Sequence, residues 1–164
     1  MSKYTIGLDF GTLSARAALV RVQDGICIAE AEHAYAHGVM DTCLPCGRPL
    51  PPDFALQHPQ DYLDVLDAVL PRLVEGVDAN EIIGIGVDCT ASTVLPVLED
   101  GTPLCLTMDF CHHPHAYVKI WKHHGAQRQA DRIAACAACE DWFERYGRQV
   151  SCEWMLPKIL EILR

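Results

Sequence analysis

The residues best suited to chemistry lie at a bend near the start of the chain. An apolar run ends in Asp9, which is followed by Gly11, Thr12, Ser14 and Arg16. A carboxylate at a strand end can organise a hydrated Mg²⁺, while glycine lets the backbone N–H groups approach phosphate oxygens closely. A guanidinium offers a planar fork to a phosphoryl group in transfer. The bend therefore indicates a phosphate loop, although the same residue types also make an ordinary hairpin turn.

Two further places combine polar groups with a position suited to a ligand. Residues 88–93, DCTAST, are mostly small and polar and follow an apolar run. Ligands of α/β sheets commonly bind past the carboxyl end of such a strand. Trp121 has polar neighbours, an arrangement that can line a sugar pocket. The alternatives are a polar strand exit for the first stretch and a core position for the tryptophan.

The cysteines raise the question of a metal site. Cys43 and Cys46 form one CxxC pair, and Cys136 and Cys139 form another, with histidines in the range 112–115 between them. Zinc needs four convergent ligands, and the pairs stand roughly 90 residues apart, beyond the usual ribbon spacing. We expect most of the nine thiols to be reduced and to pack as small apolar side chains. A zinc-dependent interaction module is the competing hypothesis.

The first half of the chain predicts the elements that position the bend. Tight turns separate three runs and predict a three-stranded antiparallel meander, over residues 4–10, 15–22 and 26–35. A Pro-rich surface loop follows at 38–57, and apolar spacing then predicts a helix over 59–75 with a kink at Pro71. The continuous apolar run at 82–88 predicts a strand buried on both faces. This order predicts an α/β fold.

The second half of the chain predicts a hairpin and two helices. The hairpin spans 92–106 around Asp100 and Gly101. Residues 114–140 are mainly helical in this interpretation, with Tyr117, Ile120, Trp121 and His124 on one stripe, and a final apolar helix covers 151–164. Its apolar face suggests an exposed patch around Ile159, Leu160, Ile162 and Leu163.

Composition limits the partners. Half of the 164 residues are hydrophobic, which suffices for one domain with a core. The net charge of -9 argues against nucleic acid, because binding a phosphate backbone needs a basic face. No apolar run approaches the roughly 18 residues that cross a bilayer, and Asp9 interrupts the stretch that a signal peptide would need. We expect a cytoplasmic protein with neither a nucleic-acid nor a membrane partner.

Several stretches together resemble the bacterial L-ribulokinases, which belong to the FGGY carbohydrate kinase family. They run over essentially the whole chain and read YTIGLDFGTLSARAALV, HGVMD, LPPDFALQHPQDYLDVL, IIGIGVDCTASTVLPV, DGTPLCL, PHAYVKIWKHHGAQ and RYGRQVSCEWMLPKILEIL. The bend alone is shared with the wider sugar-kinase, actin and chaperone superfamily. LQHPQDYLDVL and SCEWMLPKILEIL are much more specific to ribulokinases.

The resemblance implies a ribonuclease-H-like, actin-like ATPase fold. Residues 1–164 would form the N-terminal part of the first FGGY kinase domain, with the C-terminal ATP-binding domain absent. It also implies Mg-ATP as cofactor and phosphorylation of the 5-hydroxyl of L-ribulose, a step of L-arabinose catabolism. The general base is expected in the absent part, so this chain would hold no catalytic residue and be inactive alone.

The resemblance also assigns roles to residues. At the bend, Asp9 would bind Mg²⁺ through water and Arg16 would approach the γ-phosphate. Gly11, Thr12 and Ser14 would belong to the first phosphate loop.

For the sugar, Ala91 would make a backbone contact, Trp121 would border the pocket and Lys158 would reach the ketose. One departure is Arg148, where relatives usually have glycine, which strains the backbone if a positive φ is needed there. The chain is thus expected to need a complementing C-terminal chain or to form a homo-oligomer. A non-catalytic sugar-binding or sensor module is the alternative.

Overall fold

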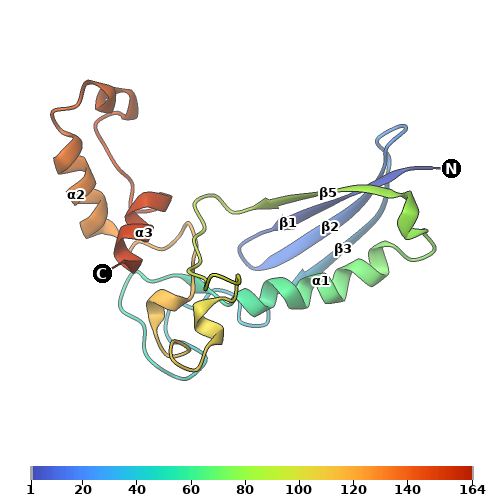
Figure 1. Ribbon diagram of the computed structural model, residues 1–164, viewed down its shortest axis with the longest axis horizontal. Coiled ribbons are helices and arrows are strands. Elements are labelled where there is room, and N and C mark those ends of the chain that lie inside the picture. The colour runs from blue at the N-terminus through green and yellow to red at the C-terminus, as the bar shows by residue number, and fades with distance from the viewer. Residues whose placement is uncertain (1, 164) are drawn as a thin grey trace. The chain divides into compact units, whose positions relative to one another are not determined.

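The computed structural model describes residues 2–163 and consists of two compact units (Figure 1). Unit 1 comprises residues 2–38 and 58–90, and unit 2 comprises residues 39–57 and 91–163. The strands are β1 (Tyr4–Phe10), β2 (Ser14–Arg21), β3 (Cys27–Ala34), β4 (Leu56–Gln57), β5 (Ile82–Cys89) and β6 (Val118–Lys119). The α-helices are α1 (Pro59–Leu73), α2 (Gln127–Ala137) and α3 (Met155–Ile162). The 3₁₀ turns are η1 (Ala79–Glu81), η2 (Leu104–Leu106), η3 (Pro114–Ala116) and η4 (Asp141–Tyr146).

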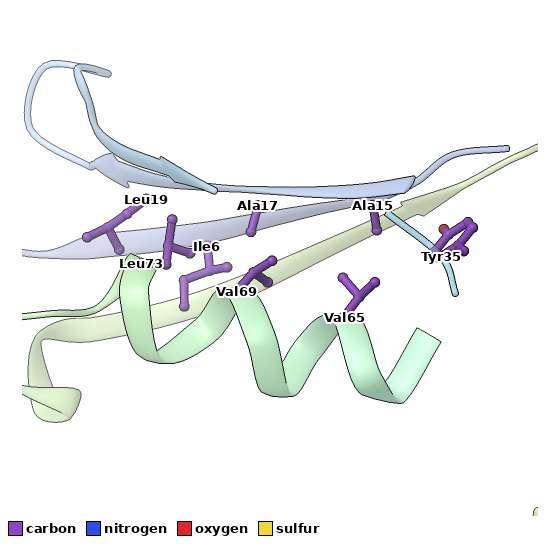
Figure 2. Close-up of a cluster of buried hydrophobic side chains, with 8 residues drawn as sticks. All are labelled: Ile6, Ala15, Ala17, Leu19, Tyr35, Val65, Val69 and Leu73. Carbon is purple, nitrogen blue, oxygen red and sulfur yellow. The ribbon is translucent and has the colours of Figure 1, made fainter. Parts of the chain in front are cut away.

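Unit 1 is a four-stranded sheet with one helix against it. The strand order is β3-β2-β1-β5, with the first three strands antiparallel and β5 parallel to β1. Figure 2 shows side chains of the sheet, such as Leu19, facing Val65, Val69 and Leu73 of α1 across the core. The predicted meander and the helix that follows it are therefore confirmed, and Pro71 lies within the last turn of α1.

The prediction that β5 is buried on both faces is wrong in this chain. Ile83, Ile85 and Val87 are 56%, 61% and 66% exposed. The reason is that β5 is an edge strand, and α1 packs over β2 and β3 instead of over β5. An apolar strand at an uncovered edge is the main departure from the burial that the sequence pattern indicates.

Unit 2 is built from short elements around its own core. The two strands β4 and β6 pair antiparallel, and Leu44, Leu56 and Tyr117 are buried beside them. The predicted helix over 114–140 is wrong for its first half, because η3 and β6 occupy that part and only α2 is α-helical. The extended segment around Lys119 forms an isolated bridge with Val94, and its apolar residues Val118 and Ile120 are fully buried.

Two other predictions for unit 2 are met only in part. The hairpin over 92–106 is reduced to a single bridge between Val97 and Pro103 around the turn at Gly101. The helix predicted from residue 151 begins only at Met155, the first residue of α3. Before it, the Oγ of Ser151 accepts the N–H of Glu153 and holds a turn. No helix among residues 2–163 has both the length and the apolar character to cross a bilayer.

Candidate functional site

The predicted phosphate loop is the tight bend between β1 and β2. The Gly11 N–H donates to the Ser14 carbonyl over 3.0 Å and closes the bend. A Cβ on Gly11 would lie 3.0 Å from the same carbonyl oxygen, so a larger residue would push the two strand ends apart. Asp9 and Arg16 face each other in the strand register on either side of this bend. The five residues named from the sequence therefore lie together.

The charged groups at the bend are open to solvent. An Arg16 guanidinium nitrogen lies 3.7 Å from a carboxylate oxygen of Asp9, and the two side chains are 68% and 53% exposed. An exposed pair of this kind contributes at most about 1 kcal/mol, so an anionic ligand can recruit the guanidinium at little cost. Ser14 donates its hydroxyl to Glu32 over 2.7 Å, and Glu32 is also the register partner of Arg16 on β3.

A second carboxylate lies beside Asp9. Asp88 on β5 is its register partner, so both strands carry an aspartate at the same position near their carboxyl ends. The two aspartates, Arg16 and Glu32 line a hollow of about 750 Å³ on the sheet, whose floor includes Gly7 and Gly86. Oxygen donors of this kind suit a hydrated Mg²⁺, and the guanidinium suits a phosphate. The sequence did not single out Asp88 as a partner of Asp9, although both apolar runs end in aspartate.

The residues assigned to the sugar all lie in unit 2. Ala91 is exposed in the turn after β5, and Trp121 is 41% exposed. Lys158 on α3 is fully buried, and its ammonium group donates to the Ile120 carbonyl over 3.0 Å, immediately before Trp121. Burial lowers the pKa of Lys158 to about 8. The ammonium group of Lys158 is therefore held at the start of the segment that carries Trp121.

A buried polar network lies next to Lys158, and sequence reasoning missed it. One carboxylate oxygen of Glu161 lies 3.1 Å from the Lys119 ammonium group and 2.7 Å from a ring nitrogen of His123. Although burial acts to raise it, the hydrogen bond from His123 and the charge of Lys119 lower the pKa of Glu161. Burial lowers the pKa of Lys119. The network joins α3 to β6 and to the segment that follows it. Its only signal in the sequence was Glu161, one helical turn after Lys158.

The CxxC pairs do not form a cluster. Within residues 2–163, the grouping of three side chains close enough to share a metal ion contains no cysteine. The four cysteines of the pairs are exposed free thiols. The expectation that most thiols pack as small apolar side chains is wrong, since only Cys105 is buried and Cys152 is intermediate.

Comparison with known proteins gives close sequence relatives. No family model matches the chain. A ribulokinase of Mycolicibacterium smegmatis is 52% identical over 168 residues, and a ribulokinase of Shouchella clausii is 50% identical over 167 residues. These matches cover 98% and 99% of this chain but only 30% of each relative. The chain thus spans about a third of the length of the curated relatives that it matches.

Solved structures give the fold. A "xyloylose" kinase from Brucella ovis superimposes with a TM-score of 0.72 at 19% identity, over 98% of this chain and 29% of that one. A glycerol kinase from Plasmodium falciparum, solved with ADP, superimposes with a TM-score of 0.65 at 12% identity, over 99% and 29%. The α/β fold with an antiparallel meander is thus the one found in carbohydrate kinases. The chain is a ribulokinase homologue that spans 30% of its relatives' length and has the actin-like, ribonuclease-H-like fold of the FGGY carbohydrate kinases.

Proposed function

We propose that this chain is the N-terminal part of a kinase that transfers the γ-phosphoryl group of Mg-ATP to the 5-hydroxyl of L-ribulose. The observation that carries the proposal is the bend, where Asp9, Arg16 and the Gly11 backbone converge at one solvent-open edge of the sheet. The names of the sequence relatives support the sugar. In this proposal the part of the relatives that this chain does not match supplies the general base and the adenosine pocket.

The bend would act by positioning and charge. Phosphoryl transfer leaves little covalent chemistry to the protein, so placing the reactants and neutralising charge supply the rate enhancement. Asp9, with Asp88 beside it, would hold the water shell of Mg²⁺, and the metal would neutralise charge on the phosphates. Gly11, Thr12 and Ser14 would contact phosphate oxygens, and Arg16 would leave its weak pair with Asp9 to meet the γ-phosphate.

The sugar would be bound by unit 2. Trp121 presents part of its ring to solvent, and a ketose can stack on such a face. Lys158, which is fully buried, would act by holding the Ile120 carbonyl and with it the segment that carries Trp121, and Ala91 would act through its backbone. A complementing part, whether a further segment or a second chain, would cover the surfaces that this chain exposes.

The experiment completes the chain with the remaining part of the Mycolicibacterium smegmatis ribulokinase, its 52% identical relative. We expect ATP-dependent phosphorylation of L-ribulose by the completed protein and none by the 164-residue chain alone. If the chain alone binds L-ribulose and the completed protein shows no turnover, a sugar-binding module replaces the kinase proposal. Preference for another ketose would overturn the choice of substrate.

Variants of the completed protein test the bend. Asp9→Ala should abolish turnover while L-ribulose binding survives, because the aspartate serves the metal and not the sugar. Asp67→Ala is the matched control, since Asp67 is an exposed aspartate of the same unit on α1. Lys158→Ala should instead weaken L-ribulose binding. A near-normal kcat in Asp9→Ala would show that the bend has been assigned wrongly.

A further inference from the structure

Three side chains of unit 1 meet where the segment that follows β3 lies beside the start of α1. His37 lies three residues after β3, His58 is the N-cap of α1, and Asp61 lies in its first turn. One possible ligand atom from each lies within 4.8 Å of those of the other two. Among residues 2–163 this is the one grouping of three histidine, cysteine or acidic side chains that comes so close. None of the three residues was predicted from the sequence to have a role.

Asp61 is a buried carboxylate. It is 1% exposed; one of its oxygens accepts the backbone N–H of His37 over 3.1 Å, and the other lies 2.7 Å from a ring nitrogen of His37. A buried carboxylate needs a positive partner to offset the loss of water. In the described part of the chain the ion-pair partner of Asp61 is this imidazole, and neither lysine nor arginine joins it.

The two imidazoles lie face to face beside this carboxylate. The rings of His37 and His58 are stacked, with centroids 4.3 Å apart and an angle of 17° between planes. The side chain of His37 is 36% exposed, so an ion can reach the group from solvent.

We propose that His37, His58 and Asp61 bind one divalent transition-metal ion of the zinc class, through one nitrogen of each ring and one carboxylate oxygen. Two imidazoles and a carboxylate are ligands that Zn²⁺ and Co²⁺ accept, with a fourth position left to water. Bonds of about 2.1 Å place tetrahedral ligand atoms about 3.4 Å apart, so the ring nitrogen of His37 and the Asp61 oxygen, now 2.7 Å apart, would separate by about 0.7 Å on binding. His37 makes that movement, because it is the exposed member.

The ion would join the end of the meander to the start of α1. His58 and Asp61 are three residues apart at the helix start and share one face, while His37 approaches from the other segment. Binding to the folded chain alone would raise its stability in proportion to the logarithm of metal concentration. The inference does not depend on kinase activity, since none of its three groups belongs to the proposed phosphate or sugar sites.

Cobalt is the probe, because nine thiols compete for zinc and thiolate ligation to Co²⁺ has its own charge-transfer absorption. The metal-free 164-residue chain is titrated with Co²⁺ and followed by visible absorption and by its thermal midpoint. We expect one equivalent, a tetrahedral ligand-field spectrum without a thiolate band, and a raised midpoint. Absence of that spectrum, or a thiolate band in its place, would overturn the proposal.

Two variants and one control assign the ligands. His37→Ala and His58→Asn should each weaken Co²⁺ binding by about tenfold or more, since even second-shell losses cost about that much. Asparagine keeps an N-cap for α1, so the variant should fold. His33→Ala is the control, because His33 is exposed on β3 and should leave affinity unchanged. Unchanged affinity in both ligand variants would show that the ion binds elsewhere.

Discussion

Lys158 makes the stability of unit 2 depend on pH in a direction that can be measured. Its side chain is fully buried, and burial lowers the pKa of its ammonium group to about 8. In the unfolded chain the pKa of a lysine is about 10.4. Between these two values the folded chain binds fewer protons than the unfolded chain, so the free energy of unfolding rises with pH. Below pH 8 both states hold the proton, and the buried charge lowers stability by a constant amount.

The magnitude follows from the two proton affinities. Each tenfold difference in proton affinity between the folded and unfolded states changes the free energy of unfolding by about 1.4 kcal/mol. The full change is therefore about 3 kcal/mol, of which about 2 kcal/mol develops between pH 7 and pH 10. Other groups titrate in the same range, so the comparison is with Lys158→Met, which keeps an unbranched chain without the charge. The Ile120 carbonyl keeps the His123 N–H as a donor in this variant.

The assay is urea unfolding at pH 7, 8, 9 and 10, followed by tryptophan fluorescence. All three tryptophans, Trp121, Trp142 and Trp154, lie in unit 2, so their signal reports the unit that contains Lys158. The wild-type chain should gain about 2 kcal/mol over Lys158→Met across this range. Parallel pH profiles of the two proteins would refute the reasoning, because the ammonium group would then titrate alike in both states.

Two further predictions concern the backbone of unit 2. Gly125→Ala should lower the free energy of unfolding by about 1–3 kcal/mol, because its Cβ would lie 2.8 Å from the Phe54 ring and 2.9 Å from a Glu161 oxygen. Urea unfolding measures it, and unchanged stability would mean that the packing there is loose. Arg148→Gly should raise the thermal midpoint, because Arg148 has a φ of 54° that costs about 1 kcal/mol in any residue but glycine. The contacts of the Arg148 side chain, an ion pair with Glu144 and a hydrogen bond to the Ala138 carbonyl, are both exposed and therefore weak. Arg148→Ala, which loses both contacts but keeps the backbone strain, should be less stable than either protein.

Local patterns were enough to place the strands and the helix of unit 1 along the chain, although not the burial of β5, since turn residues and apolar period fix short-range structure. The turn at Gly25 and the apolar spacing of 59–75 act within a few residues, and the strands and helix lie where these signals place them. The strain expected at Arg148 is likewise present, because its φ is positive. Residues 114–126 were misassigned because Tyr117 and Ile120 satisfy a helical spacing as well as they satisfy a buried extended segment. Only the pairing of β6 with β4, some 60 residues earlier, separates the two.

The chemistry of the sites depended on contacts that sequence order does not show. The bend could be found because Asp9 to Arg16 are close in the chain, whereas its neighbour Asp88 arrives through the pairing of β5 with β1. The same holds for Glu161, which meets Lys119 and His123 across 38 residues or more. A buried charge such as that of Glu161 needs a partner, because an unpaired buried charge is costly. Whether the charge is buried, and which residue pairs with it, depends on the packed structure and not on the order of residues in the chain.

The exposure of β5 bears on what completes the site. Its apolar sequence predicts burial, yet Ile85 and Val87 are exposed because α1 packs over β2 and β3 and leaves β5 uncovered. On the other face of the sheet, Gly7 and Gly86 leave a floor without side chains beside the carboxylates of Asp9 and Asp88. Exposed apolar surface such as that of Ile85 and Val87 is stabilised when further protein covers it. A segment that covered these apolar residues would lie on the face opposite the proposed phosphate site, so the remaining part of the proposed kinase would have to reach both faces of the sheet beside β5.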